Sequence, residues 1–269
     1  MPELPEVETI ARGLAQRITG DTIQSVWLGS KPEPLKSSAE EIASTLEGSR
    51  IESVGRVGKH IVFDLKHGRE RRQWIVHLGM TGQLLLARPE NEIAKHTHAL
   101  LRLASGRELR FVDPRRFGRL RVIRGDGFQP TGTEPLDVGF ELFASLFRKR
   151  KTPIKSALLN QKLLRGIGNI YADESLFRAG IRPRRRAGLL TRAELRALFD
   201  SVQQVLNEAI AAGGSTISDY VDSDGEDGLF QFQHRVYGRE GEPCLACRTP
   251  IKRLVIAGRS THYCPQCQK

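Results

Sequence analysis

The N-terminus of the chain carries a candidate nucleophile. Met1 is followed by Pro2, so removal of the initiator methionine would expose a secondary amine. The pKa of an α-amino group is roughly 8, so part of it is neutral near pH 7 and able to form a Schiff base with a masked aldehyde such as the anomeric carbon of a sugar. Glu3 could shuttle protons, and Glu6, one helical turn further on, could hold the site in register. A proline and two glutamates also suit the first turn of an ordinary helix, so both interpretations are open.

The four cysteines form a candidate metal site. All lie in the last 26 residues, as two Cys-x2-Cys pairs separated by 16 residues. Two disulfides would suit a secreted protein, but the N-terminus has no export-signal pattern. The spacing therefore favours one structural zinc ion held by four thiolates, in a segment too short to build a hydrophobic core. The predicted ligands are Cys244, Cys247, Cys264 and Cys267.

Two glycine-containing segments could contact a nucleic acid. Residues 166–170 (GIGNI) lie between two helical stretches, where a glycine turn exposes backbone N–H groups suited to a phosphate, and Asn169 adds an amide donor. A plain helix–helix corner is the alternative interpretation. Residues 113–118 (DPRRFG) place Arg115, a second arginine and Phe117 on one turn after a strand. A guanidinium beside an aromatic wedge suits the replacement of a base drawn out of a duplex.

One methionine and five isolated cations are further candidates. Met80, within the segment HLGMTG, could serve as a second wedge, although a methionine is more often a core side chain. Arg259 lies five residues before Cys264. A metal-pinned hairpin would hold it rigidly for a phosphate contact or for electrostatic catalysis. Each of the five, taken alone, could also be an ordinary solvated charge: Lys59, His96, Arg150, Lys155 and Arg259.

The charge balance of the chain indicates a polyanionic partner. There are 42 Lys and Arg against 31 Asp and Glu, a formal charge of +11, and the pI is about 9.9. Nucleic acid is one such partner, and ribosomal proteins and membrane-surface binders share this bias. Hydrophobic residues make up 39% of the 269 residues, which is compatible with packed cores. No apolar run approaches the ~20 residues of a membrane span, so we expect a soluble, cytoplasmic protein.

These candidate residues require elements to position them. Apolar residues at helical spacing predict a helix over residues 5–18. The β-rich runs that follow are typical of an antiparallel sandwich or barrel, and lie at 22–28, 51–57, 61–65, 74–78, 84–87, 99–103, 108–112 and 120–123. Residues 125–137, rich in Gly, Pro and Thr, indicate a linker. Helical periodicity then predicts helices near 138–149, 153–160, 169–179 and 191–212.

The expected fold class is therefore α+β. An N-terminal helix and an antiparallel β domain would span residues 2–124, and a helical domain residues 138–237. A zinc ribbon would follow over residues 238–269. We expect a basic cleft between the two larger domains.

Four motifs together resemble a known family. Residues 2–8 (PELPEVE), the DPRRFG turn, residues 162–177 (KLLRGIGNIYADESLF) and the C-x2-C-x16-C-x2-C ending occur in the order found in formamidopyrimidine-DNA glycosylase, the bacterial oxidised-purine repair enzyme. The resemblance runs from residue 2 to the end of the chain. It implies a β-sandwich catalytic domain, a helix–two-turn–helix domain that grips the DNA backbone beside the lesion, and a zinc finger.

The resemblance also implies roles for individual residues. Pro2 would be the Schiff-base nucleophile and Glu3 the adjacent proton donor. Lys59 matches the lysine assigned to β-elimination, and Arg259 the arginine linked to δ-elimination and phosphate binding. The predicted DNA contacts are His96, Arg115, Arg150, Lys155 and Asn169, and the predicted void-filling set consists of Met80, Arg115 and Phe117.

The implied reaction acts on DNA and needs no redox or nucleotide cofactor. The enzyme would flip a damaged nucleotide out of the duplex, let Pro2 attack C1′ as the base departs, and cut the strand by β- and δ-elimination. The implied partner is duplex DNA containing oxidised bases or abasic sites, bound by a monomer at the nucleoid. Two positions depart from the family: Arg150 stands where lysine is usual, and Asp227 stands where proline is usual, in the loop associated with capping a flipped 8-oxopurine.

Two other functions compete with this interpretation. An endonuclease VIII-type glycosylase of the same fold would prefer oxidised pyrimidines, but Leu4 and the void-filling set favour the purine enzyme. A zinc-dependent DNA-binding protein without chemistry would give no covalent adduct with lesion DNA in the presence of borohydride. The intact catalytic set argues against it.

Overall fold

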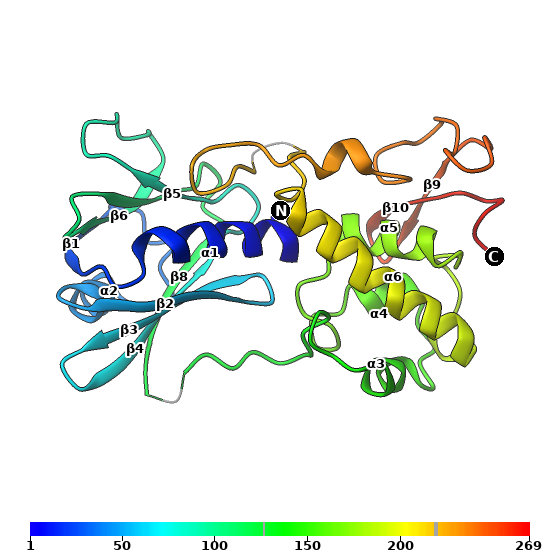
Figure 1. Ribbon diagram of the computed structural model, residues 1–269, viewed down its shortest axis with the longest axis horizontal. Helices are drawn as coiled ribbons and strands as arrows, with labels where there is room; N and C mark the ends of the chain where they lie inside the picture. Colours follow the sequence, from blue (N-terminus) through cyan, green and yellow to red (C-terminus); the bar gives the residue numbers. More distant parts are fainter. Residues whose placement is uncertain (126, 218–219) are drawn as a thin grey trace. The chain divides into compact units, whose positions relative to one another are not determined.

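The computed structural model describes residues 1–125, 127–217 and 220–269, which form two compact units (Figure 1). Unit 1 comprises Met1–Pro130 and Ala212–Leu229, and unit 2 comprises Thr131–Ala211 and Phe230–Lys269. The second stretch of unit 1 was expected in the helical domain. It belongs to the first unit because Tyr220 packs into the core of the β domain. The expected linker includes residue 126, which lies outside the described residues.

Unit 1 is a helix packed on a β-sandwich. Helix α1 (Leu4–Ile18) precedes two four-stranded antiparallel sheets with the strand orders β1-β6-β7-β5 and β2-β3-β4-β8 (Figure 1). The first sheet contains β1 (Ile23–Leu28), β6 (Thr97–Leu103), β7 (Glu108–Val112) and β5 (Gln83–Ala87). The second contains β2 (Arg50–Val57), β3 (His60–His67), β4 (Glu70–His77) and β8 (Arg119–Arg124). Each strand predicted from the sequence is present, and the arrangement is the sandwich.

A single core holds α1 against both sheets. Val7, Ile10 and Leu14 of α1 are fully buried and belong to the same apolar cluster as Phe63 of one sheet and Leu101 of the other. Burying one such aliphatic side chain contributes about 1.5–3 kcal/mol. The helix is therefore docked along its length, and its first turn is held in a fixed position on the sandwich.

One helix of unit 1 was not predicted. Helix α2 (Ala39–Leu46) begins after Ser38, whose side chain accepts a hydrogen bond from the backbone N–H of Glu41 at 3.1 Å. It buries only Ile42, Thr45 and Leu46. Eight residues give too few repeats for an apolar period to stand out, although Ser38 is a good N-cap signal.

Unit 2 is helical and ends in a small β-hairpin. The four predicted helices are present as α3 (Phe140–Phe147), α4 (Ile154–Leu158), α5 (Asn169–Arg178) and α6 (Arg192–Ala211), with single 3₁₀ turns at Ala187–Leu189 and Phe230–Gln233. Strands β9 (Lys252–Ile256) and β10 (Arg259–Tyr263) form the hairpin within the cysteine ribbon. The predicted α+β class with a helical domain and a terminal ribbon is confirmed. Within the described part of the chain, none of the helices has the length and apolarity of a membrane span.

Candidate active site

The first turn of α1 fixes the candidate nucleophile and its neighbours. Glu3 is the N-cap residue: the Glu6 carboxylate accepts its backbone N–H at 2.8 Å, and the Glu3 carboxylate accepts the backbone N–H of Glu6. This reciprocal capping box satisfies N–H groups that a helix start otherwise leaves open. Glu3 and Glu6 are 4% and 1% exposed, and Pro2 is buried. The structure thus brings these three predicted residues together, and the half-exposed Met1 precedes them.

The second carboxylate oxygen of Glu6 binds a distant segment of the chain. The backbone N–H of Ser215 donates to Glu6 Oε1 at 2.8 Å. Gly214 has a φ of +82°, and a Cβ there would lie 2.8 Å from the same oxygen, so this approach requires glycine. The hydroxyl of Tyr220 donates to the carbonyl of Gly213 at 2.9 Å. Burial and the nearby Glu6 raise the pKa of Tyr220, which keeps this hydroxyl protonated as a donor.

Ser215 and Tyr220 were not predicted as part of the site. The glycine pair before Ser215 was the available signal in the sequence. However, Ser215 and its hydrogen-bond partner Glu6 are 209 residues apart. Only the fold brings the segment to α1.

Lys59 lies on a two-residue turn between β2 and β3. Val57 pairs with His60, and Gly58 between them has a φ of +60°, which suits the first position of a type II′ hairpin turn. The guanidinium of Arg56 donates to the Gly58 carbonyl at 3.0 Å and to Glu8 of α1 at 2.7 Å. The turn that carries Lys59, itself 8% exposed, is therefore tied to the helix that begins at the candidate nucleophile.

Two histidines lie beside this turn in neutral form. The backbone N–H of Gly79 donates to His77 Nδ1 at 3.0 Å, so this nitrogen is an acceptor. Burial, together with His60, Arg119 and Lys59, lowers the pKa of His77 to about 4. Burial also lowers the pKa of His60, whose ring centroid lies 4.9 Å from that of His77. Near pH 7 neither ring adds positive charge next to the lysine.

The predicted void-filling residues lie on two turns, one with Met80 and one with Arg115 and Phe117, whose backbones are in close contact. Met80 and Phe117 are 42% and 51% exposed, and the Arg115 guanidinium lies 4.8 Å from the centroid of the Phe117 ring. Gly79 has a φ of +64°, and a Cβ there would lie 2.5 Å from the Phe117 carbonyl carbon. Such exposed apolar tips on closely packed backbone are suited to insertion into a base stack.

A buried carboxylate joins these two turns. Asp113, fully buried, accepts hydrogen bonds from Thr81 Oγ1 at 2.6 Å, from the Gly118 N–H at 2.7 Å and from the Arg115 N–H at 3.2 Å. Its own backbone N–H donates to the carbonyl of the exposed His96 at 2.9 Å. Sequence reasoning used the arginine and the phenylalanine of this motif and missed the aspartate that orders it.

In unit 2, the N-terminus of α5 holds the hairpin that carries Arg259. Asn169, the first residue of α5, donates through Nδ2 to the Ser260 carbonyl at 2.9 Å. The Asp173 carboxylate accepts the backbone N–H of His262 at 2.8 Å. Arg259 is exposed and follows a two-residue turn, Ala257 and Gly258, whose φ values of +48° and +74° match a type I′ turn.

Lys155 requires a correction to the predicted DNA contacts. Its side chain is fully buried, and its ammonium lies 2.7 Å from Asp173, 2.7 Å from the Ser260 carbonyl and 2.8 Å from Thr261 Oγ1. An ammonium enclosed by these three acceptors cannot also contact a phosphate. Lys155 instead joins α4, α5 and β10, and so supports the strand that begins at Arg259.

The side chains of the four cysteines form one cluster. Their sulfur atoms all lie within 4.8 Å of one another, with Cys247 and Cys264 at 3.4 Å and Cys244 and Cys267 at 3.9 Å. In a tetrahedral zinc site with bonds of ~2.3 Å, sulfur atoms are about 3.8 Å apart, so the residues fit this ion. Disulfides are absent among these described cysteines, because bonded sulfur atoms would be ~2 Å apart.

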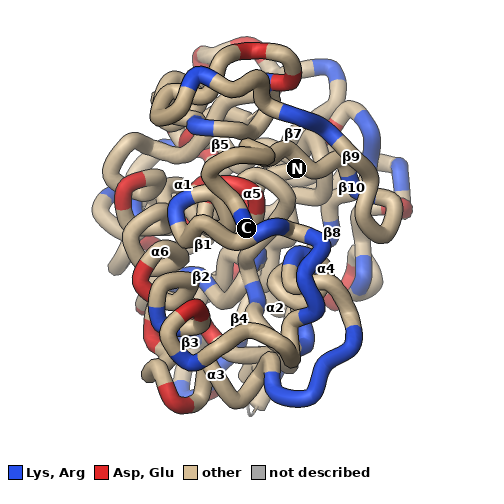
Figure 2. The backbone as a smooth tube through the Cα atoms, turned by 90° about the vertical axis from the view of Figure 1, so that its right-hand side faces the viewer, with Lys and Arg blue, Asp and Glu red and all other residues tan. Residues whose placement is uncertain are grey.

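Two basic segments lie next to each other in unit 2. Residues 148–151 (RKRK) precede α4, and residues 184–186 (RRR) run beside that connection, because Ile154 N–H donates to the Arg185 carbonyl at 2.7 Å and the Gly188 N–H donates to the Arg150 carbonyl at 2.9 Å. Figure 2 shows long runs of Lys and Arg along the chain near α4. Arg150, half-buried, was predicted from the sequence, whereas the second run was not, although three adjacent arginines were visible.

Family comparisons cover nearly the whole chain. The sequence profile of the formamidopyrimidine-DNA glycosylase N-terminal domain matches residues 1–120, and that of the formamidopyrimidine-DNA glycosylase H2TH domain matches residues 131–221. A profile described as a zinc finger found in FPG and IleRS matches residues 241–269. The chain is 47% identical to the formamidopyrimidine-DNA glycosylase of Solibacter usitatus and 44% identical to that of Thioalkalivibrio sulfidiphilus, with complete coverage of both chains in each case.

Solved structures show the same similarity. A Lactococcus lactis FPG mutant in complex with DNA containing Fapy-dG has a TM-score of 0.92 at 36% identity, with complete coverage of both chains. The L. lactis FPG in complex with DNA containing an abasic site has a TM-score of 0.91 at 36% identity over 99% of both chains. The FPG protein of Thermus thermophilus has a TM-score of 0.88 at 44% identity, covering 99% of this chain and 98% of that one.

Proposed function

The chain belongs to the formamidopyrimidine-DNA glycosylase family, and from this we propose that it removes oxidised purines from duplex DNA and then cleaves the abasic site. The observation that carries the proposal is the first turn of α1, where Pro2, Glu3 and Glu6 are ordered by reciprocal hydrogen bonds. Relatives of high similarity bind DNA that contains Fapy-dG or an abasic site, which are a substrate and an intermediate of this reaction.

The chemistry starts at the Pro2 nitrogen, once Met1 has been removed. The nitrogen attacks C1′ while the bond from C1′ to the damaged base breaks, and the departing base takes a proton, for which Glu3 is the proposed donor. The attacking nitrogen loses its proton, and the C1′–O4′ bond of the sugar then breaks as O4′ takes a proton. Because the amine is secondary, the product is an open-chain cationic iminium, which withdraws electrons from the sugar. The burial of Glu3 and its place next to Pro2 support this role.

Strand cleavage follows from the acidified sugar. Loss of a C2′ proton expels the 3′ phosphate, and the second elimination expels the 5′ phosphate. Lys59 is the proposed residue for the first step, supported by its rigid turn and its tie to α1. Arg259 is the proposed residue for the second step and for a phosphate contact, supported by its exposure on a hairpin that Asn169 and Lys155 hold.

We assign DNA binding to two exposed apolar side chains and to several polar and cationic ones. Met80, Arg115 and Phe117 fill the void that the flipped nucleotide leaves, a role supported by their exposure on one pair of packed turns. The proposed backbone contacts are His96, Arg150 and Asn169.

We further propose that Cys244, Cys247, Cys264 and Cys267 hold one structural zinc ion per chain, which the sulfur distances support. The ion would fix the ribbon and takes no part in bond breaking. The proposed setting is a monomer that acts on chromosomal DNA in the cytoplasm.

Borohydride trapping tests this function. The protein is mixed with an 8-oxoguanine·cytosine duplex and sodium borohydride, and the intact mass of the product is measured. We expect one covalent adduct per chain, with a protein mass that lacks Met1 and with the link mapped to Pro2. A matched protein that carries an uncleaved N-terminal extension should fold equally well by circular dichroism and form no adduct.

Two outcomes would contradict the proposal. One is an extended protein that still traps and cuts the duplex at the normal rate, because its position 2 nitrogen is an amide. The other is faster trapping on a thymine glycol duplex than on the 8-oxoguanine duplex, which would indicate the pyrimidine-specific alternative.

A further inference from the structure

The segment Ala212–Leu229 of unit 1 is described at residues 212–217 and 220–229, and these form a loop closed at its base; we call them the return loop. The Leu229 N–H donates to the Ala212 carbonyl at 2.9 Å, and the Gly228 N–H donates to Thr216 Oγ1 at 2.9 Å. A Cβ at Gly228 would lie 2.4 Å from the Gly214 carbonyl oxygen. The backbones at the two ends of the loop are therefore in direct contact. One end also carries the hydrogen bond from Ser215 to Glu6. The base of the loop is thus fixed next to the candidate nucleophile.

The far part of the return loop is fixed at the other end of α1. The Arg17 guanidinium donates to the Asp224 carboxylate and to Ser223 Oγ, and Ser223 is 1% exposed. The Ser223 carbonyl accepts the backbone N–H of Leu86 in β5 at 2.9 Å. Glu6 and Arg17 are eleven residues apart, which is about 16 Å along a helix axis. Described residues of the loop therefore contact α1 at both ends of that span.

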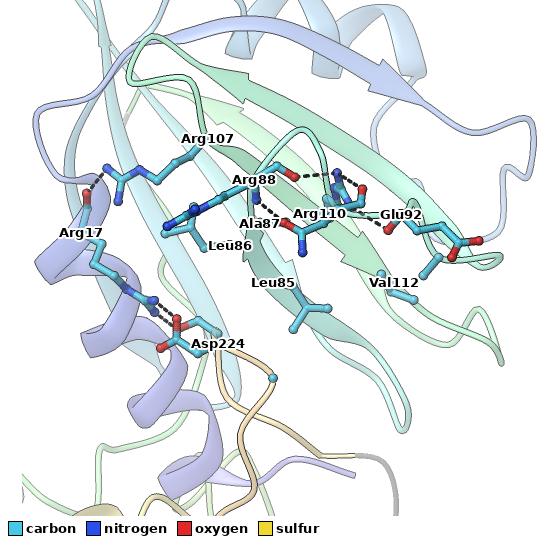
Figure 3. A pocket seen from close by; sticks show the side chains of 14 residues that line it. Arg17, Leu85, Leu86, Ala87, Arg88, Glu92, Arg107, Arg110, Val112 and Asp224 are labelled. Carbon is cyan, nitrogen blue, oxygen red and sulfur yellow. Dashed lines mark hydrogen bonds and ion pairs between the residues drawn. The ribbon is translucent and has the colours of Figure 1, made fainter.

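The residues around Arg17 hold its side chain in position for the contact with Ser223 and Asp224. Figure 3 shows its side chain directed at Asp224. Arg17 and Asp224 line a pocket of about 700 Å³, together with residues of β5. The backbone carbonyl of Arg17 accepts a hydrogen bond from Arg107 at 2.5 Å. Gly13, inside the same helix, is where a Cβ would lie 2.8 Å from Ser223 Oγ and 3.3 Å from Arg17 Nη2. Glycine is unfavourable in a helix interior, and here it leaves space for the loop.

Asp224 is presented to Arg17 by a local turn. Asp222 Oδ1 accepts the backbone N–H groups of Asp224 at 2.8 Å and Glu226 at 3.0 Å, and the Asp222 N–H donates to the Glu226 carbonyl at 2.9 Å. Gly225, at the tip, has a φ of +85°. The carboxylate is thus held by a preformed turn.

We propose that Arg17 is a positioning residue for recognition of the damaged base. Through Ser223 and Asp224 it holds the return loop along α1. The base of this loop is bonded through Ser215 to Glu6, which also accepts the backbone N–H of Glu3, the residue after Pro2. A base attached to the carbon that Pro2 attacks must lie close to this loop. The inference rests on the proposed function and adds to it a residue that selects the substrate without touching it.

The exposure of the ion pair between Arg17 and Asp224 predicts that its loss affects the return loop and not the stability of the whole unit. The Arg17 and Asp224 side chains are 27% and 53% exposed, and ion pairs of such exposure add little to global stability. Loss of the guanidinium should therefore leave unit 1 folded and loosen only the loop, since local segments can open independently of the core.

The experiment compares two substrates of one enzyme. An 8-oxoguanine duplex has a base to be recognised, whereas an abasic duplex has none and requires only the Schiff base and the eliminations. For Arg17→Met we expect the single-turnover rate of 8-oxoguanine release to fall about three- to fivefold. Cleavage of the abasic duplex should stay within about twofold of wild type, and Arg17→Lys should recover part of the loss. Lys66→Met, which removes another exposed pair (with Glu52) in unit 1, is the matched control and should change neither rate.

Gly13→Ala provides a second variant with an independent expectation. Alanine favours the helix, so thermal stability should be kept or raised, while the new methyl group displaces Ser223 and slows 8-oxoguanine release. Equal loss on both substrates, or none on either, in the Arg17→Met variant would overturn the inference. The proposed function fails separately, if wild-type protein gives no borohydride adduct.

Discussion

Buried carboxylates order much of the backbone around the candidate residues. Glu6 binds the N–H groups of Glu3 and Ser215, and Asp113 binds two turns. In unit 2, the fully buried Glu174 accepts the N–H groups of residues 235, 236 and 237 at 2.9, 2.9 and 2.8 Å. Burial raises the pKa of Glu174, and these three donors oppose that rise. Such hydrogen bonds offset part of the desolvation penalty of the carboxylate.

The sequence predicted one of these carboxylates and missed two. Glu6 was found because its partner Glu3 lies one helical turn away. Asp113 and Glu174 bind backbone groups of other segments, and any residue type supplies a backbone N–H. No side-chain pattern therefore marks them, and only the folded chain identifies their partners.

The neutral His77 makes stability depend on pH. Its folded pKa of about 4 lies below the unfolded value of 6.5, so protons favour the unfolded chain. The stabilisation is complete above pH 6.5 and is lost as the pH falls toward 4. Between pH 7 and pH 5 this residue alone should lower the free energy of unfolding by about 2 kcal/mol. In the His77→Asn variant, Oδ1 can still accept the Gly79 N–H, so the pH dependence should shrink by that amount.

Urea unfolding at pH 7, 6 and 5 measures this difference. His67→Asn, which changes an exposed histidine at the end of β3, is the control and should follow the wild-type curve. A His77→Asn variant whose stability falls as steeply with pH as wild type would show that the ring is not held neutral by the fold.

At the scale of elements, the strands of unit 1 and five of the six α-helices of the described chain were predictable, and the short connections were not. Alternation and helical spacing located β1 to β8 and α1, α3, α4, α5 and α6, whereas the eight-residue α2 and the ribbon strands β9 and β10 were not predicted. The turn that contains Lys59 and the turn that precedes Arg259 have the same form: both are two-residue hairpin turns with positive φ at glycine. Gly58 and Gly258 are visible in the sequence, but a glycine marks a hairpin only when the flanking residues pair.

The contact between α4, α5 and β10 leads to a prediction for Lys155→Met. The variant keeps the length of the side chain but leaves Asp173 buried without its ammonium partner at 2.7 Å. Removing one member of a buried ion pair costs about 3–5 kcal/mol. We therefore expect a loss of that size in the free energy of unfolding, followed by weaker strand cleavage through the displaced hairpin of Arg259.

Lys151→Met is the comparison for this variant, because Lys151 is exposed in the preceding basic segment. Its effect on stability should stay below about 0.5 kcal/mol. If Lys155→Met unfolds like wild type and only binds DNA less tightly, the side chain acts by direct contact with DNA and its structural role is wrong.

The candidate residues are divided between the two units of the molecule. Pro2, Glu3, Glu6 and Lys59 belong to unit 1, whereas Asn169, Arg259 and the four cysteines belong to unit 2. The sequence indicated both groups and the order of the elements. It did not indicate that the chain re-enters unit 1 after α6, because the signal for that return is the packing of Tyr220 and the approach of Gly214 to Glu6, which are contacts over more than 200 residues.

This division predicts the effect of removing the proposed zinc ion. Unit 1 has its own apolar core. Among the described residues, the cluster at the ribbon is small: it consists of Val236, Cys244, Ile251 and Cys264, with Phe177, Cys247 and Cys267 packed against it. In such segments the binding of the metal supplies the free energy of folding. Incubation with a strong chelator should therefore unfold the ribbon and displace Arg259, while α1 and the sandwich keep their fold. Affinity for an abasic duplex should fall at least about tenfold, since phosphate contacts are lost.

Zinc analysis, fluorescence anisotropy with labelled DNA and thermal melting measure the loss of the metal, the loss of affinity and the unfolding of the ribbon. Added zinc should reverse all three. Full affinity and an unchanged melting curve after complete loss of the metal would mean that the ribbon folds without it.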